Sequence, residues 1–476
     1  MHAVRRRVLI LVENLPVPFD RRVWQEACAL RDGGYDVTVI CPRMRGHTQV
    51  EEVLDGIQIY RHWIAAEART PFGFLLEYAS ALLGEFWHAW KAMSRHGRFD
   101  VIHLCNPPDL LFLVALPLKL LFGTRVVFDV HDLCPEMFEA KFGARGSQSG
   151  RAAPHPDPLP ASCPPRASET RRGEREIVFQ PPQDRIPSPP PTGGDADSDS
   201  LRGRGRVRGE SDTCGRKFPL LSMHGLLYRA VRLAERATLA LADVVIATNQ
   251  SVLAAVTRRG HLQADSAFVV RTAPNALDTA APRDEALKQG KTHLVGYIGV
   301  MGSADGVEYL LKAAHHLIQA QKRTDVHFLL MGSGPEYDAL LSLRDELGLT
   351  AQVSMPGRVS DAFLCSALQT IDLGIACDPI NAYNDHCTMN KVLEYMAFAK
   401  PVVMFGTMEG RHSAGEAGTY VMENNAVKLA EAISSLLDDP TRRQQMGRAG
   451  FDRLTTELNW QKSTASLHAA YERALR

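Results

Sequence analysis

The chain has 476 residues, of which 45% are hydrophobic and 23% are charged. This size and composition predict a soluble globular protein with roughly two or three domains. The 54 Lys and Arg residues balance 54 Asp and Glu residues, so the chain lacks the basic charge that is typical of nucleic-acid-binding proteins. The nine cysteines are scattered and never form Cys-x-x-Cys pairs. This pattern argues against a disulfide framework and a zinc site, and it predicts a reducing, cytoplasmic location.

Short runs rich in valine and isoleucine alternate with helical patterns in the first half of the chain. Several runs have the composition of buried parallel strands, namely residues 8–12, 37–41, 101–104, 126–130 and 244–248. Apolar residues recur at helical spacing over residues 22–31, 74–95 and 226–242. This alternation predicts an α/β domain with a doubly wound sheet.

Residues 110–122 are the most membrane-like stretch of the chain. The stretch is shorter than the roughly 20 residues that span a bilayer, and it contains Pro117 and Lys119. We expect a buried helix that leads into a strand at residues 125–130. A peripheral contact of residues 72–90 and 110–121 with the inner face of the plasma membrane is the open alternative.

Residues 144–217 interrupt this rhythm with a composition rich in proline and arginine. Such a segment buries too little apolar surface to offset the entropy of ordering, and it predicts a disordered insertion. It contains Asp195-Ala196-Asp197, a pattern that holds a metal–diphosphate in some enzymes. Because no strand or helix is predicted to position these acids, we interpret them as solvated and predict no metal site.

The second half repeats the alternation independently. The predicted strands are residues 294–297, 327–331, 352–355, 373–376 and 401–405, and the predicted helices are residues 306–321, 337–347, 362–370 and 390–399. The two halves join near residues 274–291. We expect domains at residues 1–275 and 276–455 and a terminal helix at 456–476 that crosses back to the first domain. Two such sheets predict a ligand cleft at the carboxyl ends of their strands.

The segment 384–403 is the most informative part of the chain. Thr388 is a candidate N-cap for a helix whose free N–H groups and positive dipole end suit a diphosphate. Lys391 and Glu394 are three residues apart, so they share a helix face. One can meet phosphate while the other accepts hydrogen bonds from ribose hydroxyls. The alternative is an ordinary capped helix with a surface lysine and a first-turn acid.

Several motifs in this order resemble retaining glycosyltransferases of family four, which have the GT-B fold. They are Glu13-Asn14-x-Pro16-x-Pro18-x-Asp20-Arg21-Arg22, Phe128-Asp129-x-His131-Asp132, Asp243-Val244-Val245-Ile246, Gly296-Tyr297-x-Gly299, Met331-Gly332-Ser333-Gly334-Pro335 and the segment 384–403. The resemblance covers residues 8–143 and 221–476. Within this family, the chain is similar above all to bacterial enzymes of exopolysaccharide and O-antigen assembly.

The resemblance implies a donor site in the second half. Glu394 matches the second Glu of the Glu-x7-Glu pattern, which binds the ribose, whereas His386 stands at the first Glu. The other donor-side candidates are Lys391, Asn390, Asp385, Gly299, Gly302, Arg358, Gly332 and Gly334. The family commonly has Arg and Lys after the first glycine turn, and this chain has Val300 and Asp305. Lys391, Arg358 and the glycine-rich backbone would then have to neutralise the diphosphate.

The resemblance also implies roles in the first half. His131 and Asp132 follow a predicted strand, and the matching His of the family lies beside the transferred sugar. The acceptor-side candidates are Glu13, Asn14, Arg21 and Arg22. Arg21 or Arg22 is predicted to reach phosphate, and the alternative for Arg22 is that it only begins a helix. Glu136 is a further candidate, and Arg271 and Asn275 are expected near a hinge.

The predicted function is transfer of a sugar, with retention, from a nucleotide-diphosphate donor such as a UDP- or GDP-sugar. A glycan or lipid-linked acceptor of cell-surface polysaccharide synthesis is expected, with no cofactor and no metal. Two alternatives stay open at this point. One is a nucleotide-sugar epimerase of the same fold, and the other is a catalytically inactive scaffold that binds a sugar nucleotide.

Overall fold

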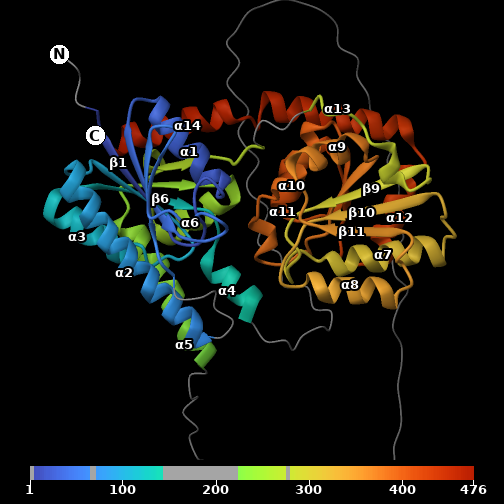
Figure 1. The fold of residues 1–476 in the computed structure, drawn as a ribbon, viewed down its shortest axis with the longest axis horizontal. Helices are drawn as coiled ribbons and strands as arrows, with labels where there is room; N and C mark the ends of the chain where they lie inside the picture. The colour runs from blue at the N-terminus through green and yellow to red at the C-terminus, as the bar shows by residue number, and fades with distance from the viewer. Residues whose placement is uncertain (1–4, 65–70, 143–222, 275–278) are drawn as a thin grey trace, which may run out of the picture. The chain divides into compact units, whose positions relative to one another are not determined.

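The computed structural model describes residues 5–64, 71–142, 223–274 and 279–476. The residues on both sides of 145–220 form one compact unit, which contains two sheets (Figure 1). The predicted insertion at 144–217, with Asp195 and Asp197, lies outside the described residues, as does Asn275.

Within the described residues, the first sheet has eight strands in the order β3-β4-β2-β1-β5-β6-β7-β8. All of its strand pairs are parallel except β3 with β4. The strands are β1 (Arg7–Val12), β2 (Asp36–Pro42), β3 (Glu51–Leu54), β4 (Ile57–His62), β5 (Val101–Cys105), β6 (Arg125–Val130), β7 (Val244–Ala247) and β8 (Ala267–Val269). The predicted strands are present. The sequence did not indicate β4, because Arg61 and His62 end it although both are buried.

Helices connect these strands and cover both faces of the sheet. They are α1 (Arg21–Asp32), α2 (Pro71–His96), α3 (Phe112–Phe122), α4 (Cys134–Phe142), α5 (Met223–Leu241) and α6 (Gln250–Gly260). Helix α1 shows why this sequence folds as it does. The side chain of Asp20 accepts a hydrogen bond from the N–H of Val23 and so caps the helix. Val23, Ala27 and Leu30 recur at helical spacing and are fully buried.

The second sheet has the order β11-β10-β9-β12-β13-β14 within the described residues, and all of its strand pairs are parallel. Its strands are β9 (His293–Ile298), β10 (Val326–Met331), β11 (Val353–Gly357), β12 (Leu373–Ala376), β13 (Val402–Phe405) and β14 (Gly418–Val421). Its helices are α7 (Val307–Gln319), α8 (Tyr337–Glu346), α9 (Asp361–Thr370), α10 (Asn390–Ala397), α11 (Met408–Ala414) and α12 (Ala426–Leu437). This strand order is the doubly wound order of dinucleotide-binding sheets.

The chain ends in two long helices, α13 (Pro440–Thr456) and α14 (Trp460–Ala474), drawn in red in Figure 1. Helix α14 packs on the first sheet although it follows the second. Leu467, Tyr471 and Ala474 are buried in the same core cluster as Val8 and Ile10 of β1. The last helix therefore completes the core that the first strand begins.

The structure corrects the expectation that residues 110–122 form a buried helix. Val114 and Leu118 of α3 face the core, whereas Leu120 is 75% exposed and Leu121 is 64% exposed. Because the helix is apolar all round except at Lys119, its periodicity could not reveal the exposed face. In the part of the chain that the structure describes, no helix is both long and apolar enough to cross a membrane.

Candidate active site

The candidate residues follow strands at the points where the strand order of each sheet reverses. In the first sheet β1 and β5 are neighbours at this point, and Glu13 and Asn106 follow them. In the second sheet β9 and β12 are neighbours, and Gly299 and Asp378 follow them closely. Open α/β sheets bind ligands at such switch points, beyond the carboxyl ends of the strands.

His131 follows β6 and is held by a carboxylate from that strand. Its Nε2 lies 2.6 Å from Oδ2 of Asp129, which is fully buried. Arg22 donates to both oxygens of Asp129, at 3.0 and 2.6 Å. Burial would raise the pKa of Asp129, but Arg22 and His131 hold it well below its usual range. An ionised Asp129 favours a proton on Nε2 of His131, so the neutral form of the imidazole would carry its lone pair on Nδ1.

Asn106 fixes the backbone around His131. Its Oδ1 accepts hydrogen bonds from the N–H groups of His131, at 2.6 Å, and Asp132, at 3.3 Å. Its Nδ2 donates to the carbonyl of Asp132, at 2.8 Å. The side chain of Asp132 accepts a hydrogen bond of 3.3 Å from Tyr383, which follows β12 of the second sheet. The loop after β6 is thus held by groups from both sheets.

A second layer lies beneath Asp129. His103 of β5 is fully buried, and its Nδ1 lies 2.8 Å from the hydroxyl of Tyr471 on α14. Its Nε2 lies 3.6 Å from carboxylate oxygens of Asp129 and Glu26. Donor atoms of His103, Cys105 and Asp129 lie within 4.8 Å of one another. We propose no metal there, because Asp129 is already occupied by Arg22 and His131.

Lys391 lies on α10 and is buried. Its Nζ donates to both oxygens of Asp378, at 2.9 and 3.0 Å, and lies 3.5 Å from Asp305. Burial opposes its charge, but the carboxylates, above all that of Asp378, raise the pKa of Lys391 well above its usual value. Lys391 therefore stays charged, and two acids share that charge.

Glu394, one turn further along α10, has different surroundings. Its side chain is 18% exposed, and its nearest cation is Arg21, 3.8 Å away in α1. Among the described residues Glu394 accepts no hydrogen bond. Burial raises the pKa of Glu394 to about 7, against the opposing effect of Arg21 and Lys391. Arg21, an acceptor-side candidate, thus reaches the predicted ribose-binding acid.

The start of α10 differs from the prediction. The helix begins at Asn390, which is exposed, and Thr388 is not its N-cap. The hydroxyl of Thr388 instead accepts a hydrogen bond of 2.9 Å from Asn249, which also donates to the carbonyl of His386 at 2.7 Å. Nδ1 of His386 lies 3.1 Å from the hydroxyl of Ser251. The N-terminus of α6 therefore holds the segment that precedes α10.

Two glycine turns approach each other closely beyond β9 and β10. Gly299 and Gly332 have φ values of 144° and 147°. A Cβ on Gly332 would lie 1.8 Å from the carbonyl oxygen of Gly299, and one on Gly334 would lie 2.5 Å from that of Met301. Only glycine permits this approach. The N–H of Gly302 donates to Asp305, at 3.1 Å, so this acid closes the turn.

The remaining candidates have structural partners or open surroundings. Val300 is 59% exposed, and the guanidinium of Arg358 lies 4.8 Å from the ring centre of Phe19, in the loop after β1. Asp385 accepts a hydrogen bond of 3.0 Å from the N–H of Met408. Asn14, beside the buried Glu13, is half-buried.

Three charged side chains at the edge of this region form ion pairs with other side chains. Arg22 is the second residue of α1 and is buried against Asp129. Glu136 pairs with Arg259. Arg271 donates to Glu409 of α11, at 2.7 Å, and so joins the end of the first sheet to the second.

Sequence reasoning missed Asp129, Asp378 and Tyr383. Asp129 had a signal, because a carboxylate inside a run of buried apolar residues needs a charged partner. Asp378 also had one, since it follows a strand end at the switch point. Tyr383 had none, because its partner Asp132 is 251 residues away in the sequence.

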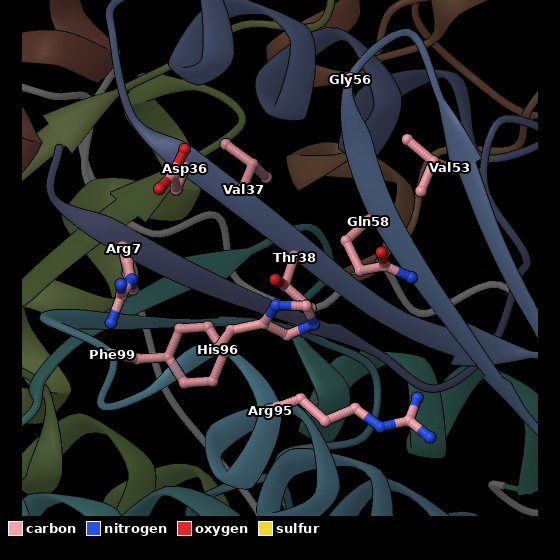
Figure 2. A pocket seen from close by; sticks show the side chains of 10 residues that line it. All are labelled: Arg7, Asp36, Val37, Thr38, Val53, Gly56, Gln58, Arg95, His96 and Phe99. Carbon is pink, nitrogen blue, oxygen red and sulfur yellow. The ribbon is translucent and has the colours of Figure 1, made fainter.

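The structure also contains a cavity away from these residues. Figure 2 shows this cavity, of about 440 Å³, whose lining includes Arg7 and Asp36 at the amino ends of β1 and β2. Arg95 and His96 of α2 also line it. None of the predicted site residues does. Because parallel sheets bind ligands at the opposite, carboxyl ends of their strands, we do not assign the site to this cavity.

Comparison with curated proteins finds relatives over part of the chain. A kanosaminyltransferase of Streptomyces kanamyceticus is 29% identical over 155 residues, which cover 32% of this chain and 38% of that protein. A lipopolysaccharide core glycosyltransferase of Rhizobium meliloti is 27% identical over 171 residues, or 33% of this chain and 45% of that protein. The chain therefore spans less than half the length of these relatives.

Solved structures match the whole fold at low identity. Sucrose-phosphate synthase from Thermosynechococcus elongatus has a TM-score of 0.64 at 17% identity, with 98% of this chain and 99% of that chain covered. The Anabaena protein HepE, in a complex with UDP-glucose, has a TM-score of 0.60 at 13% identity, with the same coverage. The fold of the chain is therefore GT-B, as predicted.

Two family models match the two halves of the chain. The model described as "Glycosyl transferase 4-like domain" matches residues 20–172, and the model described as "Glycosyl transferases group 1" matches residues 292–439. The first match covers strands of the first sheet, and the second covers the whole second sheet. With the GT-B fold, these matches show that the chain belongs to the family-four-like glycosyltransferases.

Proposed function

We propose that the chain transfers a sugar from a nucleoside-diphosphate donor to a glycan or lipid-linked acceptor, with retention of anomeric configuration. The observation that carries the proposal is the burial of Glu394 without a hydrogen-bond donor among the residues that the structure describes. It is a mostly buried carboxylate with no hydrogen bond from the described residues, one turn after the start of a helix. Such an acid has acceptor capacity to spare for a pair of vicinal hydroxyls. In the proposal, these hydroxyls belong to the ribose.

The donor diphosphate lies against backbone N–H groups in this proposal. The turns at Gly299 and Gly332 and the N-terminus of α10 supply them, and helix N-termini favour anions. Arg21 and Arg358 supply positive charge, because Lys391 is shared by Asp378 and Asp305. Catalysis then consists mainly of positioning and of stabilising the departing diphosphate. His131, oriented by Asp129, borders the transferred sugar.

Names of similar proteins guide the choice of substrates to test. The HepE structure contains UDP-glucose, and one relative from Corynebacterium glutamicum, 30% identical over 162 residues, is named a GDP-mannose-dependent mannosyltransferase. We therefore propose UDP- and GDP-sugars as the first donors to test. A role in cell-surface polysaccharide synthesis is supported by the Rhizobium relative, which is named for lipopolysaccharide core biosynthesis.

The test measures binding and turnover separately. A thermal-shift screen with UDP, GDP, ADP and CMP should show stabilisation by one base, because a ligand of the folded state raises the unfolding temperature. Glu394→Gln should weaken that binding about tenfold or more, since one charged hydrogen bond is worth about 1.5–3 kcal/mol. Glu431→Gln, at an exposed acid of α12, is the matched control. Failure of all four nucleotides to bind the parent chain would refute the donor site.

A second candidate is a protein that binds a sugar nucleotide without transferring the sugar. The pairing of Lys391 with two acids favours it, because this pairing leaves less positive charge for a departing diphosphate. Incubation with the bound donor and a glycan acceptor separates the two. Retaining transfer is supported if nucleoside diphosphate is released and the new glycosidic bond has the same anomeric configuration as the donor. Binding with no release supports the second candidate, and an epimerised free sugar supports the open epimerase alternative.

A further inference from the structure

Exposed apolar side chains are concentrated on three helices that pack on the first sheet. Of the seventeen large apolar side chains that are exposed in the described part of the chain, eleven lie on α2, α3 and α5. We call these eleven the apolar surface: Leu76, Leu83, Phe86, Trp87, Leu113, Leu116, Leu120, Leu121, Leu226, Leu227 and Leu233. Such a concentration is unusual on a soluble monomer and marks an interaction surface.

Each helix presents this surface as one continuous face. Leu113, Leu116 and Leu120 of α3 are spaced i, i+3 and i+7, which places them on the same side of the helix. On α2, Leu83 and Trp87 are four residues apart and are 71% and 69% exposed. The opposite faces of both helices pack on the sheet. These helices are therefore apolar on both sides, which a helix exposed only to water is not.

The three helices are neighbours, so their faces join. Helix α3 contacts both α2 and α5, and the three lie on the same side of the first sheet in Figure 1. The ring of Trp90 on α2 packs edge-on against Phe122 of α3, with ring centres 5.8 Å apart. The apolar surface thus extends over adjacent elements rather than isolated spots.

The exposed charged side chains of the three helices themselves have one sign, while exposed acids stand on neighbouring elements, Glu139 on α4 and Glu51 on β3. Arg229, Arg232 and Arg236 are exposed on α5, beside Leu226 and Leu233. The acidic residues of the three helices are turned inward: Glu85 and Glu235 are buried, and Glu77 is half-buried. The described residues of these three helices thus expose leucine, tryptophan and arginine but no carboxylate, a combination that complements an anionic lipid surface.

We propose that this surface docks on an anionic membrane, with α2, α3 and α5 lying in the plane of the headgroup region. Spanning is excluded by length, since α3 has 11 residues and rises about 16 Å, whereas the hydrocarbon core is about 30 Å thick. The polar Glu85 and His88 on the inner face of α2 are buried, so this helix also stays on the protein. The chain sits on the membrane and does not cross it.

Docking deepens the proposed function but does not depend on it. It would hold the first sheet at a membrane, where lipid-linked acceptors are found. Vesicle binding needs neither a donor nor turnover. The membrane assignment and the transfer assignment therefore fail independently.

The test is co-sedimentation of the full chain with vesicles of phosphatidylcholine, alone or mixed with phosphatidylglycerol. We expect binding to the mixed vesicles that weakens as salt is raised, because part of the attraction is electrostatic. The double variant Trp87→Ser/Leu120→Ser should bind about tenfold less or weaker still, since each of these side chains contributes apolar area. Arg229→Glu/Arg236→Glu should lose the preference for phosphatidylglycerol.

Met422→Ser/Val427→Ser is the matched control, because it removes two exposed apolar side chains elsewhere. It should bind vesicles as the parent chain does. Thermal unfolding of every variant should match the parent, since all the changed side chains are exposed. The proposal is overturned if the parent chain stays in the supernatant with both vesicle types. It is also overturned if light scattering shows a dimer that Trp87→Ser/Leu120→Ser dissociates while vesicles capture neither protein, because the surface then joins two copies of the chain.

Discussion

At the scale of single residues, the buried carboxylate of Asp129 is the common partner of several side chains in the candidate site. Arg22, His131 and His103 all face its carboxylate. An ion pair buried this completely adds little net stability by itself, but removing one partner leaves the other charge stranded. The same carboxylate orients His131. Stability and the proposed role of His131 are therefore coupled at one position.

We expect Asp129→Asn to lower the free energy of unfolding by about 3 kcal/mol, because the buried Arg22 then keeps only Glu26, 3.0 Å away, as an acidic partner. Urea unfolding measures this loss. Asp132→Asn, at a half-buried position one residue beyond His131, should cost much less. If Arg22→Met/Asp129→Leu is no more stable than Asp129→Asn, a stranded charge is not the cause.

Glu394 should make donor binding depend on pH. With a pKa of about 7 in the free protein, its carboxyl is protonated in mild acid and then accepts hydrogen bonds from hydroxyls poorly. The affinity for a nucleoside-diphosphate sugar should rise as pH increases through 7, by up to about tenfold per unit below the pKa. Titration calorimetry measures this rise. Glu394→Gln should bind weakly with no such step, and a step that persists in this variant would assign it to another group.

At the scale of elements, the sequence predicted most strands and helices of both sheets. Buried runs of valine and isoleucine identified β1, β2 and β6 because the parallel strands are covered on both faces. It did not identify β4, whose buried Arg61 looks like a surface residue, or the exposed face of α3. The bonds from Asn249 to the segment before α10 join residues more than 130 positions apart. Local patterns carry no information on such contacts.

The paired glycine turns give a prediction at this scale. Gly332→Ala should destabilise the second sheet and abolish donor binding, because its Cβ would meet the carbonyl of Gly299. Gly348→Ala is the matched control, since Gly348 also has a positive φ, of 68°, but has open space around it. It should cost only about 1 kcal/mol for the left-handed backbone. If both variants lower the unfolding temperature equally, the backbone angle, and not the contact between the turns, determines the loss of stability.

At the scale of the whole molecule, buried carboxyl groups make stability depend on pH. Burial, with a contribution from Glu77, raises the pKa of Glu13 to about 8. The folded chain then keeps a proton that the unfolded chain loses near pH 4.5. Between about pH 5 and 8 the folded state binds more protons at Glu13, so this group makes the free energy of unfolding fall as pH rises.

Glu13→Gln should therefore flatten the decline of stability between about pH 5 and 8, as measured by urea unfolding at several pH values. The buried His62 and the half-buried His386 have lowered pKa values and act in the opposite direction. Both the parent chain and Glu13→Gln contain these histidines. The difference between their two curves of stability against pH therefore isolates the contribution of Glu13. Parallel curves for the parent chain and Glu13→Gln would contradict the prediction.

The hydroxyl of Tyr471 connects the far end of the chain to the predicted chemistry. It meets His103, His103 faces Asp129, and Asp129 holds His131. A frameshift or fusion that disturbs only the final fifteen-residue helix would therefore loosen the imidazole more than 300 positions upstream. Screens that treat changes in this helix as harmless would miss a loss of the proposed transfer activity.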